Sequence, residues 1–130
     1  MIGLASHLTL RQTLKHQWIR GSKSPYQEII KKDQRKIVNH YKLKLSYYKN
    51  EKTKLKVIHA DSALAQKIKI IIPEEIIEFE TDNIEVNVFF EFHIDLLMNG
   101  VKSLPLNLVD EQTGAVIKDS MEVKLVGPLR

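Results

Sequence analysis

The hydrophobic pattern is most regular in residues 84–96, where every second position is apolar. The apolar positions are Ile84, Val86, Val88, Phe90, Phe92, Ile94 and Leu96. This period of two, with many β-branched and aromatic side chains, predicts a half-buried β-strand, because successive side chains of a strand point to opposite faces. At about 3.3 Å per residue the run extends roughly 40 Å. It is therefore long enough to form the centre of an antiparallel sheet, or to bend and serve two packed sheets.

Shorter stretches with the same alternation lie on both sides of this run. They cover residues 41–48, 54–59, 67–72, 104–108 and 115–125, and Pro105 favours an edge position for the fourth of them. Turn signals such as Asn99-Gly100 recur roughly every 8–15 residues, a spacing typical of sandwiches and barrels. We therefore predict a mainly β chain, α+β by content: an antiparallel β-sandwich or partly open barrel of about 7–9 strands.

One α-helix is predicted near residues 25–40. Ser24 is placed to cap it, Pro25 suits the first helical position, and Gln27 completes a capping box. Apolar side chains then recur at three-to-four-residue spacing. We expect this helix to cover a sheet face or an open end of the barrel.

Residues 1–23 contain no Asp or Glu and carry several basic side chains. The segment fits a strand, a basic arm anchored by Leu and Trp side chains, or an organelle transit peptide. We favour a basic N-terminal strand or arm over residues 1–23, followed by a single β-rich domain over residues 24–130. Trp18, the only tryptophan, is a candidate interface anchor of such an arm.

Charge is distributed unevenly along the chain, although the net charge is only +4. Residues 1–69 hold 16 Lys or Arg and 4 Asp or Glu, a balance of +12, whereas residues 70–130 hold 4 and 12, a balance of −8. Such asymmetry is typical of proteins with an anionic partner. Alternatively, basic and acidic strands alternate in the sheet and neutralise one another.

Six lysines are predicted to point outward from three successive strands, and a further four basic residues belong to the predicted helix. Together they form a candidate face for an anionic partner or nucleic acid: Lys42, Lys44, Lys54, Lys56, Lys67, Lys69, Lys31, Lys32, Arg35 and Lys36. The alternative is that these lysines protect strand edges and keep the protein in solution.

Glu91, His93 and Asp95 are the best candidates for chemistry, because alternation puts them about 7 Å apart on one strand face. They could orient a general base or bind a metal. We favour an ordinary solvated face in which the carboxylates pair with lysines of a neighbouring strand. The chain also lacks cysteine and every common phosphate-loop or hydrolase motif. We therefore predict no catalytic residue, no metal and no cofactor.

These observations predict a non-catalytic structural or protein-interaction subunit of a larger assembly, of virion, secretion or ribonucleoprotein type. The subunit would form self- or hetero-oligomers through opposed basic and acidic surfaces. The alternative is a nucleic-acid-binding module that uses the lysine-rich sheet face and the basic helix; an enzyme centred on His93 is a third hypothesis. No apolar run is long enough to span a membrane. We expect the protein in the cytoplasm or in a particle assembled there, with a mitochondrial location as the alternative.

Overall fold

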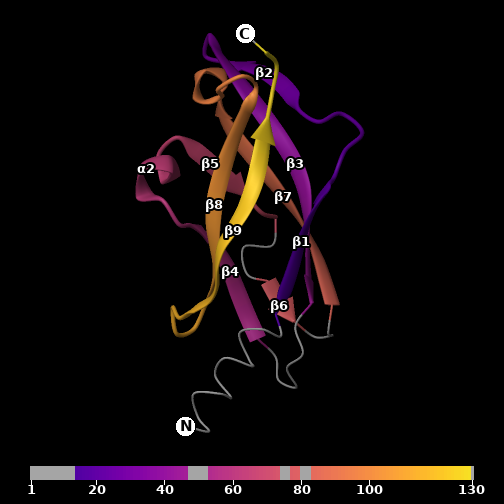
Figure 1. The fold of residues 1–130 in the computed structure, drawn as a ribbon, viewed down its shortest axis with the longest axis vertical. Helices are drawn as coiled ribbons and strands as arrows, with labels where there is room; N and C mark the ends of the chain where they lie inside the picture. The colour runs from indigo at the N-terminus through magenta and orange to yellow at the C-terminus, as the bar shows by residue number, and fades with distance from the viewer. Residues whose placement is uncertain (1–13, 47–52, 74–76, 80–82, 130) are drawn as a thin grey trace, which may run out of the picture.

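The computed structural model describes residues 14–46, 53–73, 77–79 and 83–129, which form two antiparallel sheets packed face to face (Figure 1). Sheet A contains β1 (Lys15–Arg20), β2 (Gln27–Lys31), β3 (Gln34–Ser46), β5 (Ile68–Ile71) and β7 (Asn83–His93). Sheet B contains β4 (Thr53–His59), β6 (Ile77–Phe79), β8 (Val101–Asp110) and β9 (Val116–Val126). The prediction of a mainly β, sandwich-like fold is confirmed.

The strand order is β1-β3-β7-β5 in sheet A, with β2 also beside β3, and β6-β4-β8-β9 in sheet B. The central pair of sheet A is β3 and β7, which are in register from Lys36↔His93 to Ser46↔Asn83. The predicted central strand is therefore present, but β7 ends at His93 and residues Ile94–Leu96 form the 3-10 turn η1. Inward-pointing side chains of both sheets form one hydrophobic core, with Phe90, Phe92 and Leu106 completely buried.

The prediction of a helix at residues 25–40 is wrong. This region forms the hairpin of β2 and β3, whose register closes at Lys31↔Gln34. Lys32 and Asp33 both have positive φ, at 51° and 63°, as a two-residue hairpin turn that matches the twist of the strands requires. The alternation of β3 begins at Ile37 and outweighs the helical spacing, because the period-two side chains reach the core.

The one α-helix in the described part of the chain is α2 (Ser62–Ala65). The side chain of Asp61 caps it by accepting a hydrogen bond of 2.9 Å from the Ala63 backbone N–H. This short helix connects β4 to β5. In the described part of the chain, no helix has the length and apolar composition needed to cross a membrane.

Part of the predicted N-terminal arm belongs to the sheet. β1 pairs with β3 from Lys15↔Ser46 to Arg20↔Tyr41, whereas residues 1–13 lie outside the described residues. Trp18 turns inward from β1, and its ring meets the rings of Tyr41 and Phe90 edge-on, at centroid distances of 6.0 and 5.9 Å. Trp18 is therefore a half-buried contact of the core rather than an exposed anchor.

One lateral side of the sandwich is joined by an inter-sheet clasp, formed by Asn39 and Tyr41 of β3. The Asn39 amide donates to the Val126 carbonyl at 2.9 Å and accepts from the Val126 N–H at 2.8 Å. The Tyr41 hydroxyl donates to the Lys124 carbonyl of β9 at 2.5 Å. Asn39 is fully buried, so these bonds satisfy backbone groups at the edge of sheet B that have no neighbouring strand there.

Candidate protein-interaction groove

The six predicted outward lysines do not share one face. Lys42, Lys44 and Lys69 lie on the outer face of sheet A, because each adjoins an inward-pointing core residue in β3 or β5. Lys54 and Lys56 flank the buried Leu55 of β4 in sheet B. Lys67 precedes β5, in the turn after α2. The prediction of a continuous lysine face is therefore wrong, because three strands that follow one another in sequence are divided between two sheets.

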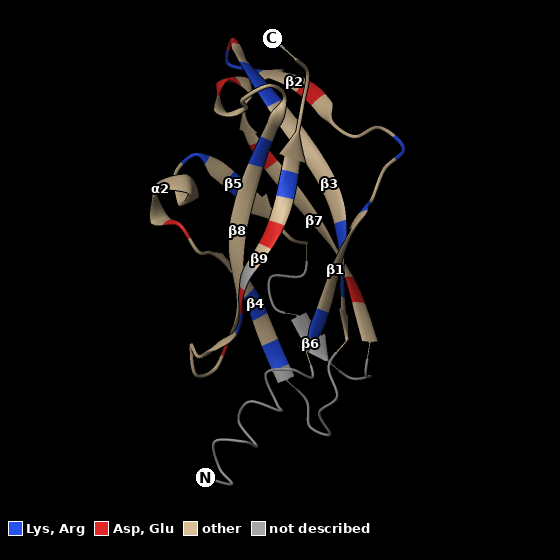
Figure 2. Cartoon of the chain, in the orientation of Figure 1, with Lys and Arg blue, Asp and Glu red and all other residues tan. Residues whose placement is uncertain are grey.

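Acidic side chains lie among the lysines of sheet A. Lys42 Nζ is 3.6 Å from Glu85 Oε1, and Lys44 is in register with the same glutamate. Lys31 Nζ is 3.4 Å from Glu91 Oε1. Figure 2 shows basic and acidic segments interspersed over the strands rather than gathered in separate regions. The expected separation into basic and acidic surfaces is thus not found on this sheet, where neighbouring strands offset one another's charge.

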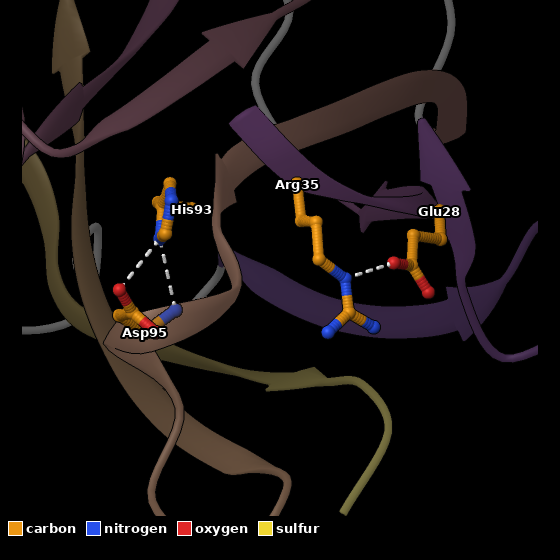
Figure 3. Close-up of polar contacts among 4 residues, drawn as sticks. All are labelled: Glu28, Arg35, His93 and Asp95. Atoms are coloured by element: carbon orange, nitrogen blue, oxygen red, sulfur yellow. Dashed lines mark hydrogen bonds and ion pairs between the residues drawn. The ribbon is translucent and has the colours of Figure 1, made fainter. Parts of the chain in front are cut away.

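The four basic residues of the mispredicted helix are brought together at the β2–β3 hairpin. Two of them, Lys31 and Arg35, are engaged by carboxylates. Arg35 Nε donates to Glu28 at 2.5 Å (Figure 3). This hydrogen bond lowers the pKa of the Glu28 carboxyl and raises that of the Arg35 guanidinium. Lys32 and Lys36 form no ion pair with any described residue. The hairpin therefore carries two unpaired lysines beside two ion pairs, which is a small surface of mixed charge with a basic excess.

The row of Glu91, His93 and Asp95 does not form, because the strand ends at His93. Asp95 lies in η1, where its backbone N–H donates to His93 Nδ1 at 3.1 Å and its carboxylate lies 3.3 Å from the same nitrogen (Figure 3). Glu91 pairs instead with Lys31. Within the described ranges, no three His, Cys, Asp or Glu side chains are grouped as metal ligands would be.

Sequence reasoning missed a polar cluster around His40 on the outer face of sheet A. The His40 ring stacks on Phe89 at 4.3 Å, and its two nitrogens lie 2.9 Å from Ser22 Oγ and from Asn87 Oδ1. A side chain at Gly21 would collide with this ring. Nδ1 thus contacts the segment between β1 and β2, whereas Nε2 contacts β7 within the sheet, so the ring links that segment to the sheet. The partners come from two segments that are far from His40 in sequence, so no local pattern identifies them.

A hollow lies on the other lateral side of the sandwich, between β4 and β5. Two adjoining hollows of about 360 and 590 Å³ share Val57, Lys69 and Ile70 and form what we call the edge groove. Its lining consists of Lys56, Val57, Ile58, His59, Ala60, Ser62, Ala65, Ile68, Lys69, Ile70, Ile71 and Ile72. The helix α2 projects from this side and lies against both strands (Figure 1).

Both strands beside the edge groove have uncovered edges among the described residues. Among the strands that the structure describes, β5 pairs only with β7. β4 pairs with β6 over Thr53–Leu55, and the same edge has no described strand partner over Lys56–His59. One hydrogen bond between described residues joins the two sheets here, from His59 Nε2 to the Ile68 carbonyl at 3.0 Å. The opening therefore presents unpaired backbone groups next to apolar side chains.

No family model matches this chain, and no curated protein matches it. Among solved structures, it is similar to the crystal structure of a FixG-related protein from Vibrio parahaemolyticus, with a TM-score of 0.62 and 13% sequence identity. The match covers 90% of this chain and 98% of that one. At this identity the likeness concerns the fold: the two chains share the arrangement of strands.

Proposed function

We propose that this chain is a non-catalytic protein-interaction subunit of a larger assembly, and that the edge groove receives a segment of a partner protein. The observation that carries the proposal is the combination of exposed apolar side chains and uncovered strand edges at one place. Ile58 and Ile71, on opposite walls, expose 37% and 39% of their surface. Burying such side chains against a partner removes apolar area from water, which is the main driving force of most protein association.

The charge arrangement favours protein binding over the alternative of nucleic-acid binding. A nucleic-acid interface needs several basic side chains that can neutralise neighbouring phosphates. In sheet A, Lys42 and Lys31 already lie beside Glu85 and Glu91, and the other lysines are divided between two sheets. The edge groove combines an apolar interior with basic residues at its rim, an arrangement that resembles the apolar core and polar rim of protein interfaces.

Site-specific photo-crosslinking in the native host tests the proposal. A photoreactive phenylalanine analogue replaces Ile71 in one variant, and in the control it replaces Met98, another exposed apolar side chain, which is 77% exposed and does not line the groove. We expect one protein, identified by mass spectrometry from its cross-linked peptide, to be captured from position 71 and not from position 98. Capture of nucleic acid alone, or identical products from both positions, would contradict the proposed function.

A further inference from the structure

The edge groove also indicates the chemistry of its occupant. We propose that it binds an extended acidic segment of a partner protein, which adds to the free edge of β5 as a further strand of sheet A. This inference rests on the proposed function, because it names the class of partner for the same groove. Its grounds are the charge of the rim, the length of the exposed edge and the alternation of side chains along β5.

The rim of the groove is basic on both walls. Lys56 projects from β4 and Lys69 from β5, and no acidic residue is among the described residues that line the groove. Lys69 is in register with Glu91, but the ion pair formed by that glutamate is with Lys31, and only 12% of its side chain is exposed. Neither Lys56 nor Lys69 forms an ion pair with another described residue. Both lysines line the smaller of the two hollows, so a carboxylate of the partner at that hollow would lie near two cations that lack a described partner.

The exposed edge is suited to a short extended segment. β5 has four residues, or about 13 Å of strand, which four or five residues of a partner would match. Along β5, Ile68 and Ile70 point toward the core, while Lys69 and Ile71 point outward. An added strand places its side chains in the same alternation. Residues opposite Ile70 would be apolar, and those beside Lys69 acidic.

The same lysine argues against a second copy of this chain as the occupant. If two β5 edges paired with each other, each would bring its own Lys69 into the joint, and like charges on adjacent strands are destabilising. Lysines on an exposed edge are a common protection against such self-pairing. An acidic strand escapes this repulsion, so Lys69 both excludes copies of the chain and selects a partner of opposite charge.

The test uses the full chain, labelled with ¹⁵N, and three synthetic peptides. The first has the sequence Glu-Val-Glu-Ile-Glu-Val, the second has lysine in place of each glutamate, and the third is the first with alternate backbone nitrogens methylated. We expect the acidic peptide to shift the amide resonances of β5 and the rim of β4, and to bind at least about tenfold more tightly than the basic and methylated peptides. Binding of the acidic peptide should weaken as salt is raised.

Charge-reversed variants provide the matched control. Lys56→Glu/Lys69→Glu should lose at least about tenfold in affinity for the acidic peptide and gain affinity for the basic one. Lys42→Glu/Lys44→Glu reverses the same number of charges on the outer face of sheet A and should change neither affinity by more than about twofold. Equal binding of acidic and basic peptides, shifts confined to other surfaces, or no shifts at β5 would each overturn the inference.

The two experiments separate the inference from the proposed function. If cross-linking from position 71 identifies a partner protein but the acidic peptide does not bind at β5, the groove is an interaction site and the acidic extended occupant is refuted. If position 71 captures no protein, the proposed function itself fails, whatever the peptides show.

Discussion

The two lateral sides of the sandwich are built differently. On one side, the inter-sheet clasp of Asn39 and Tyr41 satisfies the backbone of β9 with side chains from β3. On the other, β5 and β4 leave backbone groups uncovered within the described residues, and the edge groove lies between them. Both sides face the same problem, a sheet edge with unpaired donors and acceptors. On the clasp side, side chains of the same chain satisfy these backbone groups. On the groove side, the described residues leave them free to pair with a partner.

The difference shows how a buried polar residue can close an edge. A strand edge that is sealed by side chains cannot accept a partner strand without breaking those hydrogen bonds. In the part of the chain that the structure describes, one hydrogen bond, from His59 to the Ile68 carbonyl, joins the two walls of the edge groove. We therefore expect substitutions on the clasp side to reduce stability, and substitutions at the groove rim to change binding with little effect on stability.

The largest effect is expected from Asn39→Leu, which has nearly the same volume. The change leaves the partly buried Val126 N–H and carbonyl without their partner, at a cost of about 2–4 kcal/mol in the free energy of unfolding. Urea denaturation followed by tryptophan fluorescence measures this. Asn87→Leu is the control, because Asn87 is exposed and its side chain is hydrogen-bonded to the ring of His40. It should lose less than about 1 kcal/mol. If both variants lost a similar amount of unfolding free energy, the clasp would contribute no more to stability than a surface hydrogen bond does.

A smaller effect is expected from Tyr41→Phe, which removes the hydroxyl that donates to Lys124. The loss should be about 0.5–1.5 kcal/mol at neutral pH. Burial raises the pKa of the Tyr41 phenol, an effect that nearby Arg20 partly opposes. A phenol with a raised folded-state pKa stabilises the fold fully below its unfolded pKa, about 10. That stability is lost as the pH rises through the folded pKa.

The Tyr41→Phe variant should therefore lose less stability than the wild type between pH 9 and pH 11, with the pH range set by the unperturbed tyrosine pKa of about 10. Urea denaturation at several alkaline pH values measures the difference. Tyr26→Phe, which removes a hydroxyl from a partly buried ring outside the clasp, is the control. If the alkaline loss is the same in wild type and Tyr41→Phe, ionisation of Tyr41 does not limit stability there.

The smallest effect on stability is expected from the double variant Lys56→Gln/Lys69→Gln on the open side. Both side chains are exposed and form no ion pair with a described residue, so the free energy of unfolding should change by less than about 0.5 kcal/mol. Thermal and urea denaturation measure it. A loss above about 1 kcal/mol would mean that the rim lysines hold the sandwich together, and the contrast between the two sides would no longer stand.

The sequence determined most of the strands, because an amphipathic strand repeats its pattern locally. Alternation identified β7 and the segments that become β4, β5, β8 and β9. The secondary-structure prediction failed at residues 25–40, because the capping box and the spacing of apolar residues there are compatible with a helix. The left-handed conformation of Lys32 and Asp33, which converts this segment into a hairpin, follows from the pairing of β2 with β3 and of β3 with β7 rather than from the residues themselves.

Tertiary structure alone decided which side chains meet. Lys42 and Lys56 look alike in sequence, each between apolar neighbours in an alternating run, yet one lies beside Glu85 and the other at the rim of the edge groove. The reason is that alternation fixes which face of a strand is buried, whereas strand order fixes the neighbours on the other face. The order β1-β3-β7-β5 and β6-β4-β8-β9 is set by packing two sheets around one core, and it is this order that creates the clasp on one side and the groove on the other.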